Sequence, residues 1–140
     1  MNIVFAADGS AYTKKALAFL ASHENLAGPQ DVLYVVNVQP PLPARVKRML
    51  GSEEAAAYHG EEADKVLKPI RKFLDRHAVP YQCDWVVGNP ATEIVRAAQK
   101  KKAHMVVMGT HGYGLLGRTV MGSVAQKVTA DCDLPVLLVK

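Results

Sequence analysis

A glycine-rich stretch near the end of the chain has the residue types and spacing that suit the binding of an anion. Gly109 follows the apolar run Val106-Val107-Met108, which predicts a buried strand. Two residues separate Gly109 from Gly112, and nine more precede the pair Gly122-Ser123, where a helical pattern begins. Glycine has no Cβ, so a phosphate can approach bare backbone N–H groups, which a helix N-terminus also supplies. The spacing therefore predicts a phosphate-binding loop between a strand and a helix.

An acidic residue follows the first predicted strand. Asp8 comes directly after the apolar segment 2–7 and stands just before Ser10, a typical N-cap residue for the helical pattern that follows. A carboxylate in this position can accept two hydroxyl groups, which suits the edge of a ribose. It can also be a helix N-terminal carboxylate that accepts hydrogen bonds from backbone N–H groups. Both interpretations stay open, and the position of Asp8 favours ligand binding.

Other phosphate-binding and catalytic motifs do not fit the sequence. No glycine loop ends in Gly-Lys-Ser or Gly-Lys-Thr, so a P-loop is not predicted. Residues 112–117 match the dinucleotide pattern Gly-x-Gly-x-x-Gly, but they lie late in the chain and do not lead directly into a helix, so NAD binding is not predicted. The five histidines lack metal-ligand spacing, and no nucleophile elbow is present. We therefore assign no catalytic residue and no metal site.

Alternating strand and helix patterns position these residues. Short runs of β-branched and other apolar residues predict buried strands, and amphipathic patterns between them predict helices. Because the two alternate throughout, we expect an α/β fold, a doubly wound parallel sheet of five strands with helices on both faces. The predicted strands are 2–7, 31–38, 81–87, 104–108 and 134–139, and the predicted helices are 11–21, 53–77, one that begins at Pro90, and 123–130.

Proline interrupts the pattern at two places. The segment Pro40-Pro41-Leu42-Pro43 predicts an extended loop after the second strand, either a lid over a site or a plain connector. Pro69 lies inside the helical pattern 53–77 and removes the hydrogen bond to the carbonyl of Lys65, so a kink or break is expected there. The third strand is more polar than the others, and we expect it nearer an edge of the sheet.

Length and composition limit the class of protein. A chain of 140 residues with 49% hydrophobic and 21% charged residues predicts one globular domain over residues 1–140. The net charge is +4, but the basic residues are scattered and few aromatic residues lie among them, so nucleic acid is not an expected partner. No apolar run approaches the roughly 20 residues of a membrane helix, and the two cysteines make no disulfide framework. We expect a cytoplasmic protein that does not bind membranes.

The chain resembles the universal stress protein family over nearly its whole length. The resemblance rests on the opening segment 3–10, the segment 88–94, the glycine spacing described above and the ending 135–139. It implies a Rossmann-like sheet with strand order 3-2-1-4-5, in which the order reverses between the first and fourth strands. Ligands of such sheets bind where the order reverses, outside the carboxyl ends of the strands. Asp8 and the glycine loop are therefore expected to meet in one crevice.

The resemblance also implies a nucleotide and the residues that contact it. The implied ligand is ATP, an adenine nucleotide, with Mg²⁺ carried by its phosphates. Ala6 and Val38 would line the adenine pocket, or else be ordinary core residues, and Asp8 would bind the ribose or lie beside the adenine. The other implied contacts are Met108 and Gly109, near the ribose and the first phosphate, and the backbone N–H groups of Gly112, Gly122, Ser123 and Val124, at the phosphates.

One further residue of the loop has phosphate chemistry. Arg118 carries a guanidinium group whose paired donors suit the oxygens of a terminal phosphate. It can equally be a solvated loop residue. The sequence does not decide between these two interpretations.

The leading functional hypothesis is a non-catalytic, ATP-binding regulator in the stress response. The resemblance implies that it acts as a homodimer through the apolar last strand, Leu134 to Val139, and the protein partners it regulates are unknown. One alternative is a slow ATPase or an autophosphorylating enzyme. Another is a dimeric scaffold that binds no nucleotide, and the intact glycine pattern speaks against that one.

Overall fold

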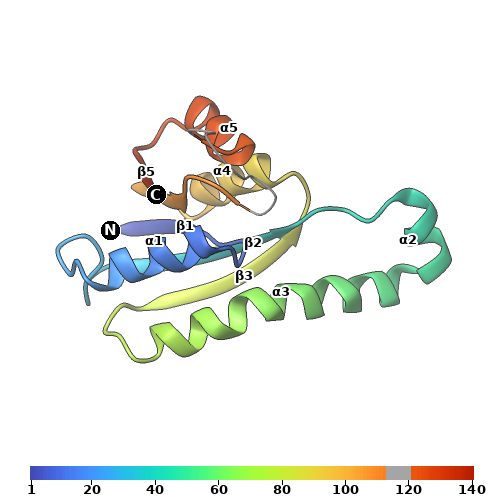
Figure 1. The fold of residues 1–140 in the computed structure, drawn as a ribbon, viewed down its shortest axis with the longest axis horizontal. Helices are drawn as coiled ribbons and strands as arrows, with labels where there is room; N and C mark the ends of the chain where they lie inside the picture. Colours follow the sequence, from blue (N-terminus) through green and yellow to red (C-terminus); the bar gives the residue numbers. More distant parts are fainter. Residues whose placement is uncertain (113–120) are drawn as a thin grey trace.

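Five parallel strands form one sheet with helices on both faces (Figure 1). The computed structural model describes residues 1–112 and 121–140. The strand order β3-β2-β1-β4-β5 confirms the expected fold class. In the described part of the chain, no helix is long and apolar enough to cross a membrane. The strands are β1 (Asn2–Ala6), β2 (Val32–Gln39), β3 (Tyr81–Val87), β4 (Met105–Gly109) and β5 (Val136–Val139), and the helices are α1 (Ala11–Ala21), α2 (Ala44–Leu50), α3 (Ser52–Leu74), α4 (Pro90–Lys100) and α5 (Ser123–Asp131).

The central strand β1 is buried on both faces. Ile3 and Phe5 belong to the hydrophobic core that the sheet shares with α1 and α3. Val4 and Ala6 belong to the second core, on the side of α4 and α5. Because successive side chains of a strand point to opposite faces, β1 supplies both cores at once. Parallel pairing with β2 on one side and β4 on the other then sets the position of every other strand.

Two predicted helix starts are confirmed. The Ser10 hydroxyl caps α1 and accepts a hydrogen bond from the Thr13 N–H at 3.4 Å. The Asn89 side chain caps α4 and accepts from the Thr92 N–H at 3.1 Å, with Pro90 at the first helical position. In both cases a side-chain oxygen satisfies one of the backbone donors that a helix leaves free at its start. The expectation that the third strand lies at an edge is also confirmed, because β3 is the outermost strand on its side.

The region after the prolines differs from the expectation. Residues Ala44–Leu50 form α2, which was not predicted from the sequence. None of its residues is buried, and its three large apolar residues lie within two turns, too short a run to mark a helix. α3 continues without a break from Ser52 to Leu74, so the expected break at Pro69 does not occur. Pro69 lies on the exposed side of the helix, between the buried residues Leu67 and Ile70. Packing of those two residues on the sheet outweighs the loss of one backbone hydrogen bond.

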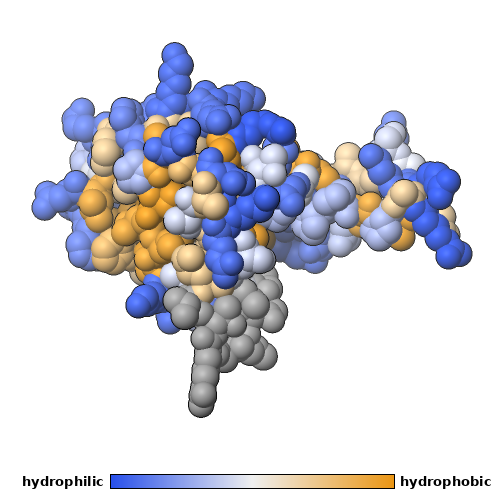
Figure 2. Space-filling view, turned by 90° about the horizontal axis from the view of Figure 1, so that it is seen from above, coloured by the Kyte–Doolittle hydropathy of each residue, from blue (hydrophilic) through white to orange (hydrophobic). Residues whose placement is uncertain are grey.

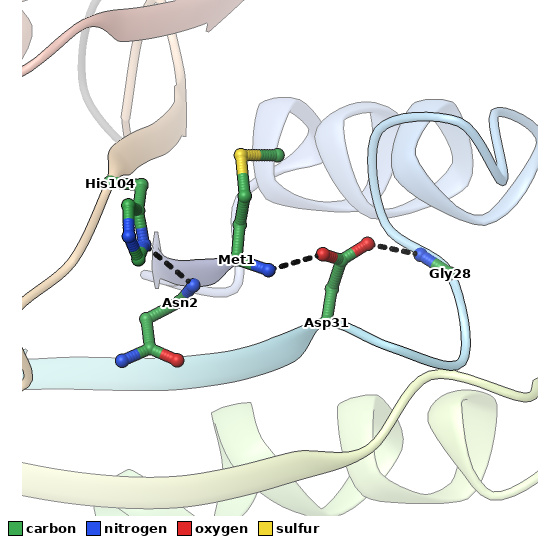
Figure 3. A network of polar contacts seen from close by, with 5 residues as sticks. All are labelled: Met1, Asn2, Gly28, Asp31 and His104. Atoms are coloured by element: carbon green, nitrogen blue, oxygen red, sulfur yellow. Dashed lines mark hydrogen bonds and ion pairs between the residues drawn. The ribbon is translucent and has the colours of Figure 1, made fainter.

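A polar network lies where the first strands begin (Figure 3). Asp31 precedes β2, and its carboxylate accepts a hydrogen bond from the Gly28 N–H at 2.8 Å and pairs with the Met1 ammonium group. Beside it, the His104 Nδ1 accepts a hydrogen bond from the Asn2 N–H at 3.0 Å. The Gly28 N–H and the ammonium group hold the pKa of Asp31 below its ordinary value of 3.8. The network therefore depends on an ionised carboxylate.

Replacement of Asp31 by asparagine is expected to lower the free energy of unfolding by about 1 kcal/mol at neutral pH, because a neutral acceptor bonds the Gly28 N–H more weakly. Since the folded-state pKa is lowered, this stabilisation is present above pH 3.8 and is lost as the pH falls through the folded-state pKa. Urea unfolding of the wild type and Asp31→Asn at about pH 7 and about pH 2 measures the difference. A difference that stays constant with pH, or an equal loss in the exposed control Glu24→Gln, would contradict this assignment.

Candidate functional site

A cavity of about 530 Å³ opens at the carboxyl ends of β1 and β4. The chain continues from β1 into α1 on one face of the sheet, and α5, which follows β4 in the chain, packs on the other face (Figure 1). The strand order therefore reverses between these two neighbours, which leaves a crevice between the departing segments. Its volume lies within the range of small-molecule sites in proteins.

One part of the cavity is apolar. Ala6, at the end of β1, pairs in register with Val36 of β2, and both line the cavity. Val38, Met108 and Ile94 extend this apolar wall from β2, β4 and α4. A wall of aliphatic side chains suits a flat ring better than a charged group, because burial of an unpaired charge costs free energy.

Asp8 stands at the edge of this wall with half of its carboxylate already bonded. Oδ1 accepts hydrogen bonds from the Ser10 N–H and the Thr13 hydroxyl, both at 2.8 Å. Thr13 Oγ1 in turn accepts from the Asp8 N–H at 3.1 Å. Oδ2 accepts no hydrogen bond from the described residues. Both sequence interpretations of Asp8 therefore describe part of the group, since one oxygen is held at the start of α1 and the other remains available.

Two glycines of the loop have different steric reasons to be glycine. A Cβ on Gly109 would lie 2.5 Å from the Cβ of Tyr12 and 3.1 Å from its backbone carbonyl carbon, because α1 packs directly on the end of β4. A Cβ on Gly112 would lie 2.5 Å from Asp8 Oδ2. The first neighbour is fixed to the backbone of a helix, whereas the second is the end of a side chain. Gly109 is therefore required by the fold, and Gly112 is required by the position of the carboxylate.

The amino end of α5 faces the same cavity. Gly122 is the N-cap residue and has no side chain to satisfy the first donors of the helix. Its own N–H donates to the Thr110 carbonyl at 2.7 Å, so this donor, expected to contact a phosphate, is bonded within the fold. The N–H groups of Ser123, Val124 and Ala125 have no acceptor among the residues described. These donors and the helix dipole favour an anion at this end of the cavity.

The structure brings together nearly all residues that the sequence singled out. Arg118 lies outside the described residues. Those that line the single cavity described above are Ala6, Asp8, Val38, Met108, Gly109, Gly112, Gly122, Ser123 and Val124.

Two polar residues of the cavity were not predicted from the sequence, and the role of the proline-rich segment 40–43 was left open. Thr13 and Thr110 line the cavity, and the signal for Thr13 is its place three residues after the N-cap Ser10. Pro40 also lines it, so the proline-rich segment begins at the cavity wall. Within residues 1–112 and 121–140, no group of three or more His, Cys, Asp or Glu side chains is placed to hold a metal ion.

The fold and this crevice define a doubly wound α/β protein whose candidate site lies at the switch point of the sheet. The model of the Universal stress protein family matches residues 1–140. The chain therefore belongs to the universal stress protein family.

Three known proteins illustrate the relationship. Universal stress protein MJ0531 of Methanocaldococcus jannaschii is 39% identical over 146 residues, which cover 99% of this chain and 81% of that protein. The solved structure of hypothetical protein MJ0577, from the same organism, matches with a TM-score of 0.85 and 27% identity over 99% of this chain and 94% of that chain. A universal stress protein from Archaeoglobus fulgidus, in complex with dAMP, matches with a TM-score of 0.71 and 25% identity over 100% and 98% of the two chains.

Gly109→Ala is expected to lower the free energy of unfolding by about 1–3 kcal/mol, because the new Cβ must displace the backbone of α1 at Tyr12. Thermal or urea unfolding measures this loss. Gly60→Ala is the matched control, since the nearest atom to its added Cβ is 3.7 Å away on the Trp85 ring and alanine favours the interior of α3. The control is expected to be as stable as the wild type or more so. Equal stability of Gly109→Ala and the wild type would show that α1 does not pack on this residue.

Proposed function

We propose that the cavity binds an adenine nucleotide, ATP, and that the protein is a non-catalytic regulator in the stress response. The observation that carries this proposal is that an apolar wall, Asp8 and the start of α5 line one cavity. An adenine needs apolar surface, a ribose needs a hydrogen-bond acceptor, and phosphates need N–H donors. The dAMP bound by the Archaeoglobus fulgidus relative supports the same class of ligand.

Asp8 is prepared for a sugar hydroxyl before any ligand arrives. Ser10 and Thr13 fix Oδ1, so the carboxylate does not have to lose rotational freedom when a ligand binds. In the proposed complex Oδ2 accepts a ribose hydroxyl, and no hydrogen bond inside the protein is broken. The adenine then lies against the apolar wall that includes Ala6 and Val38.

The phosphates of the proposed ligand lie at the amino end of α5. Ser123 and Val124 supply N–H donors there that no described residue accepts, and the loop at Gly112 passes close to Asp8 without a side chain in between. The proposal assigns Mg²⁺ to the phosphates of ATP. The partial positive charge of the helix start adds to the attraction of these donors.

The chemistry of the cavity supports a regulator more than a hydrolase. Among the described residues that line it, Asp8 is the only carboxylate, and one of its oxygens is committed to the start of α1. Hydrolysis of a phosphoanhydride needs a group that positions the attacking water and charge stabilisation at the leaving group. The protein therefore regulates its partners according to whether a nucleotide is bound, and not through hydrolysis of that nucleotide.

We also propose that the protein acts as a homodimer through residues 134–139. β5 is an edge strand whose residues are all partly exposed, and Figure 2 shows hydrophobic side chains gathered on the face where β5 lies. The carbonyls of Pro135 and Val139 accept hydrogen bonds from β4 and from the residue directly after it, so the backbone groups of the alternate residues Val136 and Leu138 face away from β4. An apolar edge of this kind is stabilised when a second strand pairs with it.

Ser123→Pro is expected to weaken ATP binding by about tenfold to a hundredfold, because it removes one N–H that faces the phosphates. Proline suits the first position of a helix, and Gly122 before it has the extended backbone (ψ 162°) that proline requires of its neighbour, so the fold is expected to persist. Isothermal titration calorimetry with ATP measures the change.

Two variants control this measurement. Ser123→Ala keeps the N–H and is expected to bind nearly as tightly as the wild type. Ser52→Pro makes the same replacement at the first position of α3, outside the cavity, and is expected to bind normally. A wild-type protein that carries no nucleotide after acid extraction and binds no adenylate in the calorimeter would overturn the proposed ligand. Turnover of ATP at a rate that Ser123→Pro abolishes would overturn the non-catalytic role.

At high salt, Leu138→Lys is expected to convert the dimer to a monomer, because it places a charge in the paired edge. Val136→Pro tests the same interface through the backbone, since it removes an N–H that faces away from β4 and proline is tolerated on an edge strand. Multi-angle light scattering measures the mass of each variant, and circular dichroism checks its fold. A folded Leu138→Lys variant with the mass of the wild type would contradict the proposed interface.

A further inference from the structure

α2 and the first turns of α3 stand away from the body of the molecule (Figures 1 and 2). We call residues 44–58 the arm. No residue of α2 is buried, and the Met49 side chain is 78% exposed. Val46, Leu50 and Tyr58 are exposed as well, so the arm carries four of the seven large hydrophobic residues that are exposed in the described part of the chain. Apolar side chains that gather on a projecting element mark an interaction surface.

The charges of the arm are separated along the chain. The α2 helix has three basic residues and no acidic one, and the first turn of α3 is acidic. Two of the basic residues lie in the last turn of α2 and the acidic pair lies in the first turn of α3, so these charges suit the helix dipoles. The dipoles explain neither Arg45 near the start of α2 nor the exposed Met49 and Leu50. Within the described chain, none of these charged side chains forms an ion pair with another residue. The basic residues are Arg45, Lys47 and Arg48, and the acidic residues are Glu53 and Glu54.

This order of basic, apolar and acidic residues is self-complementary. When two arms lie antiparallel about a two-fold axis through their apolar middle, each basic helix meets the acidic turn of the other arm. The apolar residues then form the centre of the contact and the charges form its rim, as in other protein interfaces. We propose that the arm is a self-association surface on which a second copy of this chain docks, with the apolar residues of the two arms in contact and Arg48 against Glu54.

A second copy fits this surface better than other occupants. An anionic membrane or a nucleic acid would attract the basic helix but would repel Glu53 and Glu54 directly beside it. The arm is also independent of the strand pairing proposed above. α3 packs on β2 and β3, which lie toward one edge of the sheet, and β5 forms the other edge. The contact is small, so we expect weak association that weakens further with salt.

Sedimentation velocity of Val136→Pro, in which pairing through β5 is blocked, measures association through the arm alone. We expect a reversible dimer at low salt and a weaker one at high salt. Met49→Asp is expected to weaken this dimer at least about tenfold, because a charge replaces the apolar centre. Lys68→Glu makes an even larger change of charge on the exposed side of α3, outside the arm, and is expected to leave association unchanged. Circular dichroism confirms that each variant is folded.

A charge exchange tests the two-fold arrangement itself. Arg48→Glu and Glu54→Arg, each made in the Val136→Pro protein, are expected to weaken self-association by about tenfold, since each pairs like charges twice. A mixture of the two is expected to form a heterodimer as strong as the parent dimer, because every contact then joins opposite charges. A parent protein that stays monomeric at low salt, a mixture that associates no better than either variant, or an equal loss in Lys68→Glu would each overturn the proposal.

Discussion

The side chains of residues 3–6 of β1 are all buried, so both faces of the sheet must be covered at its centre. Ile3 and Phe5 require α1 and α3 on one side, and Val4 and Ala6 require α4 and α5 on the other. Right-handed connections to both layers make the chain leave β1 and β4 in different directions. The crevice is therefore a result of how the central strand is buried. No other structural feature is needed to form the crevice.

Most of the fold could be predicted from the sequence because burial leaves a periodic pattern. The apolar runs of β1, β2 and β4, the cap Ser10 and the helix start at Pro90 were sufficient to place the elements that pack on the sheet. α2 is only seven residues long and none of them is buried, so its few apolar residues did not mark it as a helix. At Pro69 the expected break does not occur, because the packed face of α3 holds the helix together across one missing donor.

The candidate site was predictable to the level of which segments meet. Glycine spacing and the position of Asp8 pointed to one crevice, and the structure brings both segments there. Hydrogen bonds inside the site were not predictable, because they depend on distances between segments. The Thr13 hydroxyl on Asp8 and the Gly122 donor on the Thr110 carbonyl are two such contacts. They divide the polar groups of the crevice into those the fold uses and those it leaves available.

The close approach of Tyr12 to Gly109 changes how glycine patterns should be used to recognise ligand-binding proteins. A chain with this packing keeps glycine at position 109 whether or not anything occupies the crevice, because selection for a stable fold is enough to retain it. Its presence in a distant homologue therefore gives information about architecture and none about occupancy. Gly112 is more informative, because its neighbour is the end of the Asp8 side chain. A larger residue would be tolerated at position 112 in a homologue whose carboxylate at position 8 no longer binds a ligand. Functional classification within the family should therefore weigh the two glycines differently.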